Sequence, residues 1–138
     1  MAIYGVYAGT DSRTYCVELT LTSSAEALNG AAVTNLGFHS MAIDKVGWSS
    51  DLHVAKDHGG IQIILGGGIE IGVTAGDMRT IRAGAGDAVV FVDTHGDGHS
   101  SREAGAPLMA ITIRLDGNTD SMKAAFTGWP DDVAFNAP

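Results

Sequence analysis

Apolar and polar residues alternate with a period of two along much of this chain. The segments 14–21 (TYCVELTL), 69–74 (IEIGVT) and 108–115 (LMAITIRL) all follow this alternation. A period of two predicts β-strands that bury one face and expose the other. The segments 61–65 (IQIIL) and 88–92 (AVVFV) are almost continuously apolar, which is typical of strands covered on both faces.

Glycines separate these strand-like runs and complete the prediction of the fold class. The chain has 19 glycines, mainly between the runs, where turns need positive φ. Many short strands at a spacing of roughly 8–12 residues predict an all-β sandwich or barrel. Residues 119–126 (TDSMKAAF) predict a short C-terminal helix, with Thr119 as N-cap and Gly128 and Pro130 at its end. We find no linker and no repeat, so we expect one domain over residues 1–138.

The charge and composition narrow the classes of partner. The net charge is −8 with a pI near 4.8, and the eight Lys and Arg residues are scattered. This disfavours a nucleic-acid or anionic membrane surface and favours a small neutral or cationic molecule, or another protein, as the partner. Cys16 is the only cysteine, and no apolar run approaches the roughly 20 residues of a membrane span. Since the N-terminus also lacks the pattern of a signal peptide, we expect a cytoplasmic location.

Two stretches of the sequence place histidines at the ends of predicted strands. The first is GWSSDLHVAKDHGGIQIILGG (47–67), with His53 on a strand, and the second is GDAVVFVDTHGDGHSSR (86–102), with His99 after a turn. The expected same-face neighbours of His53 are Asp51 and Ala55, and the second stretch also carries Asp93, His95 and Arg102. We expect two neighbouring hairpins to direct both imidazoles into one cavity.

These stretches resemble the two motifs of the cupins, a superfamily of small double-stranded β-helix, or jelly-roll, barrels. The first cupin motif reads G-x5-H-x-H-x3–4-E-x6-G, and its frame is matched by Gly47, His53, Ala55, Gly60 and Gly67. The second motif, G-x5-P-x-G-x2-H-x3-N, is matched more loosely. VDTHGDGHSSR resembles a bacterial variant of it, at Asp93, Gly96, Gly98, His99 and Arg102. The resemblance implies an all-β jelly-roll barrel with a short C-terminal helix, and a homodimer built by strand exchange.

The departures from the cupin motifs decide what chemistry the resemblance implies. In metal-binding cupins, two histidines and a carboxylate of the first motif and a histidine of the second bind a divalent metal. Only His53 and His99 are retained here, because Ala55 and Gly60 offer no ligand atom. Gln62 lies two residues beyond the missing carboxylate, on the same expected face, and could complete a site. The cofactor therefore stays open between none and one divalent metal (Fe, Mn, Ni or Zn) held by His53, His99 and Gln62.

Three hypotheses for function follow. The leading one is an enzyme of lyase, isomerase or cyclase type, in which His53 and His99 transfer protons and Gln62 donates to a substrate oxygen. The residues expected to position its substrate are Trp48, His39, Arg102 and Asp93. The second is a metal-dependent dioxygenase or lyase, with His58 as a further possible ligand. The third is a barrel that binds a small molecule without converting it.

Each of these residues also has a structural interpretation. His53 and His99 could cap strands, Trp48 could pack in the core, and Arg102 could pair with a surface acid. Asp93 could bond to turn amides or orient His99. His39 would face the barrel interior or the outside, and the alternation does not decide which. Cys16 has no histidine near it in sequence, so we do not expect a nucleophile there.

Overall fold

The computed structural model describes five stretches of the chain. These are residues 1–21, 33–40, 49–55, 59–115 and 123–135, with the backbone alone for 33–40, 49, 114 and 115. In chain order the strands are β1 (Ile3–Ala8), β2 (Thr14–Leu21), β3 (Val33–Ser40), β4 (Ser49–His53), β5 (Gly60–Gly66), β6 (Gly68–Gly72), β7 (Thr80–Gly84), β8 (Ala88–Phe91), β9 (His99–Glu103), β10 (Met109–Leu115) and β11 (Phe126–Thr127).

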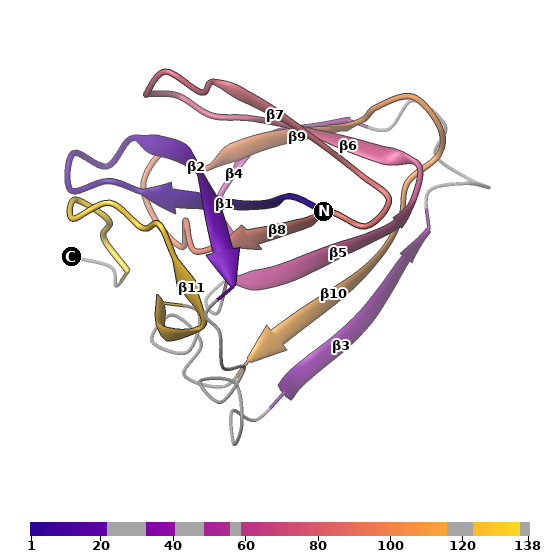
Figure 1. The fold of residues 1–138 in the computed structure, drawn as a ribbon. Helices are drawn as coiled ribbons and strands as arrows, with labels where there is room; N and C mark the ends of the chain where they lie inside the picture. Colours follow the sequence, from indigo (N-terminus) through magenta and orange to yellow (C-terminus); the bar gives the residue numbers. More distant parts are fainter. Residues whose placement is uncertain (22–32, 41–48, 56–58, 116–122, 136–138) are drawn as a thin grey trace.

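The consecutive strands β3 to β10 form a jelly roll. The β6–β7 hairpin is the innermost pair, and around it β5 pairs with β8, β4 with β9 and β3 with β10, all antiparallel. This nested ribbon is folded over into two sheets, with the orders β8-β5-β10-β3 and β4-β9-β6-β7 (Figure 1). Nested pairs divided in this way between two sheets are the jelly-roll architecture. The predicted all-β class and jelly-roll architecture are confirmed.

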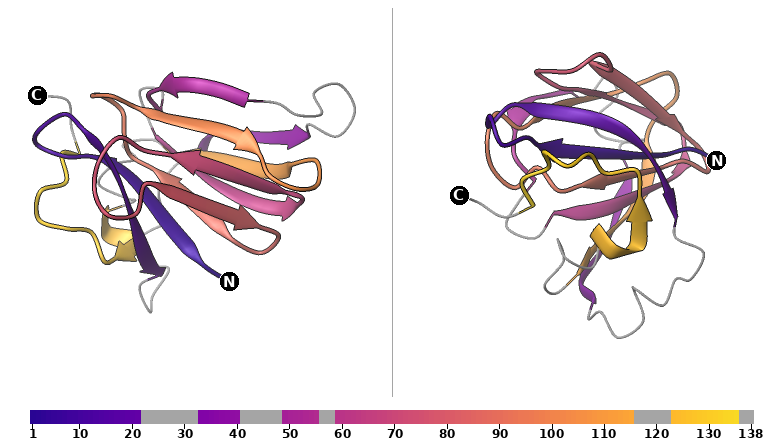
Figure 2. Two further views of the ribbon diagram at one scale, coloured as in Figure 1. Left: turned by 90° about the horizontal axis from the view of Figure 1, so that it is seen from above. Right: turned by 60° about the vertical axis from the view of Figure 1, so that its left-hand side comes forward.

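Three further strands widen one of the two sheets. β1 lies parallel to β8, β2 pairs antiparallel with β1, and β11 pairs antiparallel with β2. The result is a seven-stranded sheet in which β1 covers the edge that β8 would otherwise expose. Figure 2 shows the C-terminal segment, in yellow, running alongside β1 and β2.

Apolar side chains form two separate cores, one on each face of the seven-stranded sheet. The first lies between the sheets and includes Ile64 of β5 and Val89 of β8. The second lies on the outer face and includes Ile61 of β5 and Val90 of β8, with Phe126 packed against them. β5 and β8 are therefore covered on both faces, as their nearly continuous apolar sequences predict.

The predicted C-terminal helix ends earlier than the sequence pattern indicates. Only residues 123–125 of the described part of this segment are helical, and the expected N-cap, Thr119, lies outside the described residues. Phe126, the last residue of the expected helix, and the following Thr127 instead pair with Leu21 and Thr20 of β2. Burial of the Phe126 side chain in the outer core outweighs the local helical preference. No helix in the described stretches is long and apolar enough to cross a membrane.

The outer core predicts a strong dependence of stability on Phe126. Its side chain is only 5% exposed, whereas that of Leu21, its partner in the β-ladder, is 42% exposed. We expect Phe126→Ala to lower the free energy of unfolding by about 3 kcal/mol, because it removes a buried aromatic ring and leaves a cavity. Leu21→Ala is the matched control and should change it by less than about 1 kcal/mol. Urea unfolding of both variants measures the difference, and equal losses would contradict the packing described.

Candidate functional site

A β-bulge in β4 brings His53 opposite His99. Ser50 pairs with Ser101 of β9, and His53 pairs with His99, so β4 has one residue more than β9 between these two pairs. A bulge of this kind re-aims the side chains that follow it. The side chain of His53 therefore shares a face with that of Ser50, and our expectation that Asp51 lies on that face is wrong.

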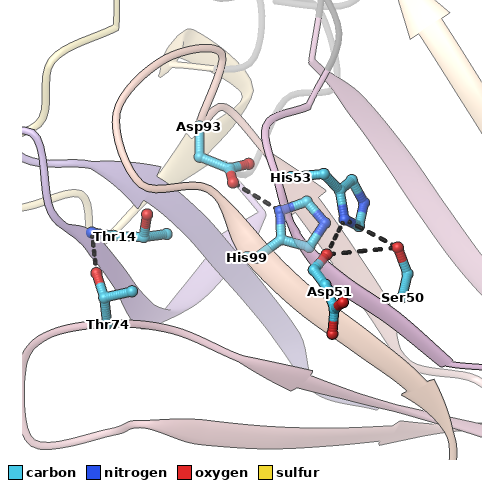
Figure 3. Close-up of polar contacts among 7 residues, drawn as sticks. All are labelled: Thr14, Ser50, Asp51, His53, Thr74, Asp93 and His99. Carbon is cyan, nitrogen blue, oxygen red and sulfur yellow. Dashed lines mark hydrogen bonds and ion pairs between the residues drawn. The ribbon is translucent and has the colours of Figure 1, made fainter.

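The two imidazole rings lie side by side. Their centroids are 4.4 Å apart and the ring planes are inclined by 57°. Figure 3 shows His53 on one side of the His99 ring and Asp93 on the other. His53 is exposed, whereas His99 is only 5% exposed. The sequence-based expectation that both histidines come together is borne out by this geometry, and they differ in their access to solvent.

Asp93 fixes the orientation of the His99 ring. Its Oδ2 lies 2.6 Å from Nδ1 of His99, and the carboxyl group is fully buried. A carboxylate can only accept a hydrogen bond, so with Asp93 ionised the proton of His99 is on Nδ1 and the lone pair on Nε2. Burial raises the pKa of Asp93, and the contact with His99 counteracts part of that rise.

A backbone carbonyl fixes the orientation of the His53 ring. Nδ1 of His53 lies 2.8 Å from the carbonyl oxygen of Asp51 and 3.2 Å from Oγ of Ser50 (Figure 3). Because a carbonyl oxygen has no proton to give, Nδ1 of His53 must be the donor. His53 therefore also has its lone pair on Nε2. Asp51, expected from the sequence as a neighbour of His53 on the strand, bonds to its ring through the backbone and not through the carboxylate.

Gly98 allows β4 and β9 to approach closely beside this pair. Its φ is +77°, and a Cβ atom at this position would collide with the backbone carbonyl of His53. Only glycine combines this backbone conformation with the absence of a side chain. The glycine of the second motif thus has a direct role in holding the two histidines together.

An aromatic ring lies near the position where the cupin motif has its carboxylate. Gly60 pairs with Phe91 across β5 and β8, and the ring of Phe91 lies 4.6 Å from that of His99. Gly60 itself places no charged group beside Phe91. The sequence analysis did not anticipate Phe91, because its contact with His99 depends on how the β8–β9 connection folds.

The donor set does not fit a metal centre with three or four protein ligands. Among the residues that the structure describes, no group of three or more His, Cys, Asp or Glu side chains could hold a metal ion. Most protein metal sites need at least three ligands. Gln62 lies on β5 with its amide unbonded to any described residue, and His58 lies outside the described residues. We therefore derive no chemical step through a metal.

The remaining candidates do not join the histidine pair. Arg102 is on the opposite face of β9 from His99 and is hydrogen-bonded to Glu70 at 2.7 Å, so the structure corrects its expected place in the pocket. His39 lies on β3 opposite Ala110, but its side chain lies outside the described part. Trp48 lies outside the described residues altogether. His95 follows Asp93 in the β8–β9 connection, with Nδ1 buried and unpartnered among the described residues.

Cys16 lies on β2, close enough to Asp93 to be affected by its charge, and its thiol is not reactive. Burial, with a contribution from the charge of Asp93, raises the pKa of Cys16 to about 12. The thiol is therefore neutral at ordinary pH and is a poor nucleophile. This agrees with the absence of a nucleophile motif around Cys16 in the sequence.

The comparisons with known proteins leave the family open. No family model matches the chain, and no curated protein matches it significantly. A crystal structure of a Salmonella typhimurium protein described as ethanolamine utilization protein Q is 14% identical, with a TM-score of 0.41 over 86% of this chain and 98% of that chain. A TM-score this low does not establish a shared fold. The assignment of the jelly roll therefore rests on the strand pairing described above.

The buried carboxyl of Asp93 predicts a pH dependence of stability. Because its pKa is raised above the unfolded value of 3.8, the folded state binds more protons than the unfolded state just above that pH. The stability that Asp93 contributes is therefore fully present below about pH 4 and is lost as the pH rises through the raised pKa. The difference between the free energies of unfolding of the wild type and of Asp93→Asn should fall as the pH rises from about 4 through the raised pKa of Asp93. Urea unfolding at a series of pH values measures this difference, and a difference that grows with pH would contradict it.

The close approach at Gly98 predicts an effect that the turn at Gly105 lacks. Gly105 has φ +79°, almost the same as Gly98, but a Cβ atom there would meet nothing within 4 Å. Gly105→Ala should lower the free energy of unfolding by about 1–2 kcal/mol through backbone strain alone. Gly98→Ala should lower it further, because β4 must also move away from β9. Thermal unfolding of the two variants separates the cost of backbone strain from the cost of the collision with His53. Equal losses of stability in both would show that the contact with His53 is unimportant.

Proposed function

We propose that this protein is a proton-transfer enzyme of the lyase or isomerase type that acts on a small organic molecule. The observation that carries the proposal is the pairing of His53 and His99, each with Nδ1 bonded and Nε2 bearing the lone pair. Neither Nε2 atom has a hydrogen-bond partner among the described residues. Two imidazole nitrogens close together can take a proton at one point of a substrate and return it at another.

The surroundings of the two rings assign them different roles. His99 is buried and bonded to the carboxyl group of Asp93, whereas His53 is exposed and bonded to a backbone carbonyl. The reaction needs one ring with a proton on Nε2 and one without. We assign that proton to His99, which makes it the general acid, and the role of general base to His53, which has no carboxylate bonded to it. This division resembles other sites in which the environment separates the roles of two titratable groups.

An elimination illustrates how such a pair works. Nε2 of His53 removes a proton from a carbon next to a carbonyl group, and the electrons of the C–H bond form a C=C bond. The bond to a β-hydroxyl breaks as Nε2 of His99 protonates the departing oxygen, which leaves as water. A proton returned to a different carbon would instead give an isomerisation. His53 then passes its proton to solvent, to which it is exposed, and His99 regains one.

Solvent exchange tests this proposal before the natural substrate is identified. The protein is incubated in D2O with a panel of small ketones and β-hydroxy acids, and deuterium entering the carbon next to the carbonyl is followed by NMR. We expect exchange with at least one compound, a loss of at least 100-fold in His53→Gln and in His99→Gln, and full exchange after treatment with a chelator. The Arg102→Gln variant is the matched control, since Arg102 lies on the other face of β9.

Three outcomes of this experiment would contradict the proposal. Exchange that survives both histidine substitutions would place the base elsewhere. Exchange that disappears with chelator and returns with a divalent metal would favour a metal-dependent enzyme. Binding of a compound with no exchange in any of the panel would favour a barrel that holds a small molecule without converting it.

A further inference from the structure

Two unpartnered oxygens lie next to each other on β5 and β10. Gln62 and Thr112 are direct partners across these strands. Oε1 of Gln62 and Oγ1 of Thr112 are both buried, and neither has a hydrogen-bond partner among the described residues. Buried polar atoms are nearly always bonded, so two such atoms on paired residues indicate a partner outside the described residues.

Both side chains face the interior between the two sheets. On β5, Gln62 shares its face with Ile64, and on β10, Thr112 shares its face with Ala110, and both of these neighbours belong to the core between the sheets. The same face of β8 carries Val89, the direct partner of Gln62, and Phe91. Since the ring of Phe91 lies against His99, an apolar surface connects the two oxygens to the histidine pair.

The interior is rich in acceptors that lack a donor. On the facing sheet, Glu103 shares the inward face of β9 with His99 and Ser101, and its Oε2 is also buried without a partner in the described part of the chain. Oε1 of Gln62 and Oε2 of an ionised Glu103 can only accept, and the hydroxyl of Thr112 can do so. A molecule that satisfies them must bring N–H or O–H groups.

We propose that Gln62 and Thr112 form the position that binds the hydrogen-bond-donating end of the substrate. The substrate class is a small molecule with an N–H or O–H group at one end and an apolar body that lies along Phe91 toward His99. This inference rests on the proposed function only for the reaction, because the binding itself can be measured without turnover. Gln62 accepts in this arrangement, which differs from the donor role we expected from the sequence.

Substitutions that keep the shape of the side chains test whether the two oxygens are structural. Thr112→Val and Gln62→Leu remove the polar atoms while retaining most of the volume. If the oxygens lack a partner in the free protein, both variants should have a higher melting temperature than the wild type. The control Thr80→Val, at an exposed position of β7, should leave it unchanged. A lower melting temperature in both variants would show that the oxygens bond within the protein, and would overturn the proposal.

Matched probe molecules test the requirement for a donor. Benzylamine is compared with the benzyltrimethylammonium ion, which has the same charge and no N–H, and benzyl alcohol with benzyl methyl ether, which has no O–H. We expect benzylamine or benzyl alcohol to raise the melting temperature of the wild type, and its counterpart to raise it less. The rise should vanish in the double variant Gln62→Leu, Thr112→Val and persist in His99→Gln.

The outcomes separate this inference from the proposed function. Equal rises with both members of each pair, or no rise with any of them, would overturn the donor-binding position. Donor-dependent binding without deuterium exchange would contradict the proposed function and leave the binding position standing. Exchange that depends on both histidines, with no dependence of binding on Gln62 or Thr112, would support the proposed function and overturn the donor-binding position.

Discussion

Asp93 is the residue on which the geometry of the histidine pair depends. It follows β8 in one sheet, and its carboxylate bonds to His99, which begins β9 in the other. Its backbone carbonyl accepts a hydrogen bond of 3.0 Å from the amide of Ala55, just beyond the strand that carries His53. One fully buried residue thus ties both histidines to the core, because its side chain holds one imidazole and its main chain holds the segment bearing the other.

Local pattern was sufficient for the fold class because alternation and glycine turns act over short distances. The segment 14–21 is β2 as its alternation predicts, and the apolar runs in β5 and β8 correspond to strands covered by two cores. The spacing of the motif residues was enough to place His53 with His99. The pairs that build the jelly roll, such as β3 with β10, join segments far apart in the chain, so they could be expected only from the resemblance to the cupins.

What the sequence did not predict depends on single-residue shifts and on long-range contacts. The bulge in β4 adds one residue, which moves every following side chain to the other face, and no local signal marks it. The incorrect expectation for Arg102 is different, because it was avoidable from the sequence. Arg102 is three residues from His99 along a strand, and this spacing places its side chain on the opposite face. The position of Thr112 was not predictable, because only the register of β10 on β5 brings it to Gln62.

The distribution of charge around His99 supports proton transfer over metal binding. In the cupin frame a carboxylate stands beside the histidines as a ligand, whereas here that position is Gly60, opposite Phe91. A carboxylate there would lie against an aromatic ring, which would remove part of its hydration. Asp93 instead lies behind His99, bonded to Nδ1, where it orients the ring and leaves Nε2 unobstructed. In the reaction that we propose, a carboxylate bonded to Nδ1 makes His99 an oriented acid, with His53 as the adjacent base.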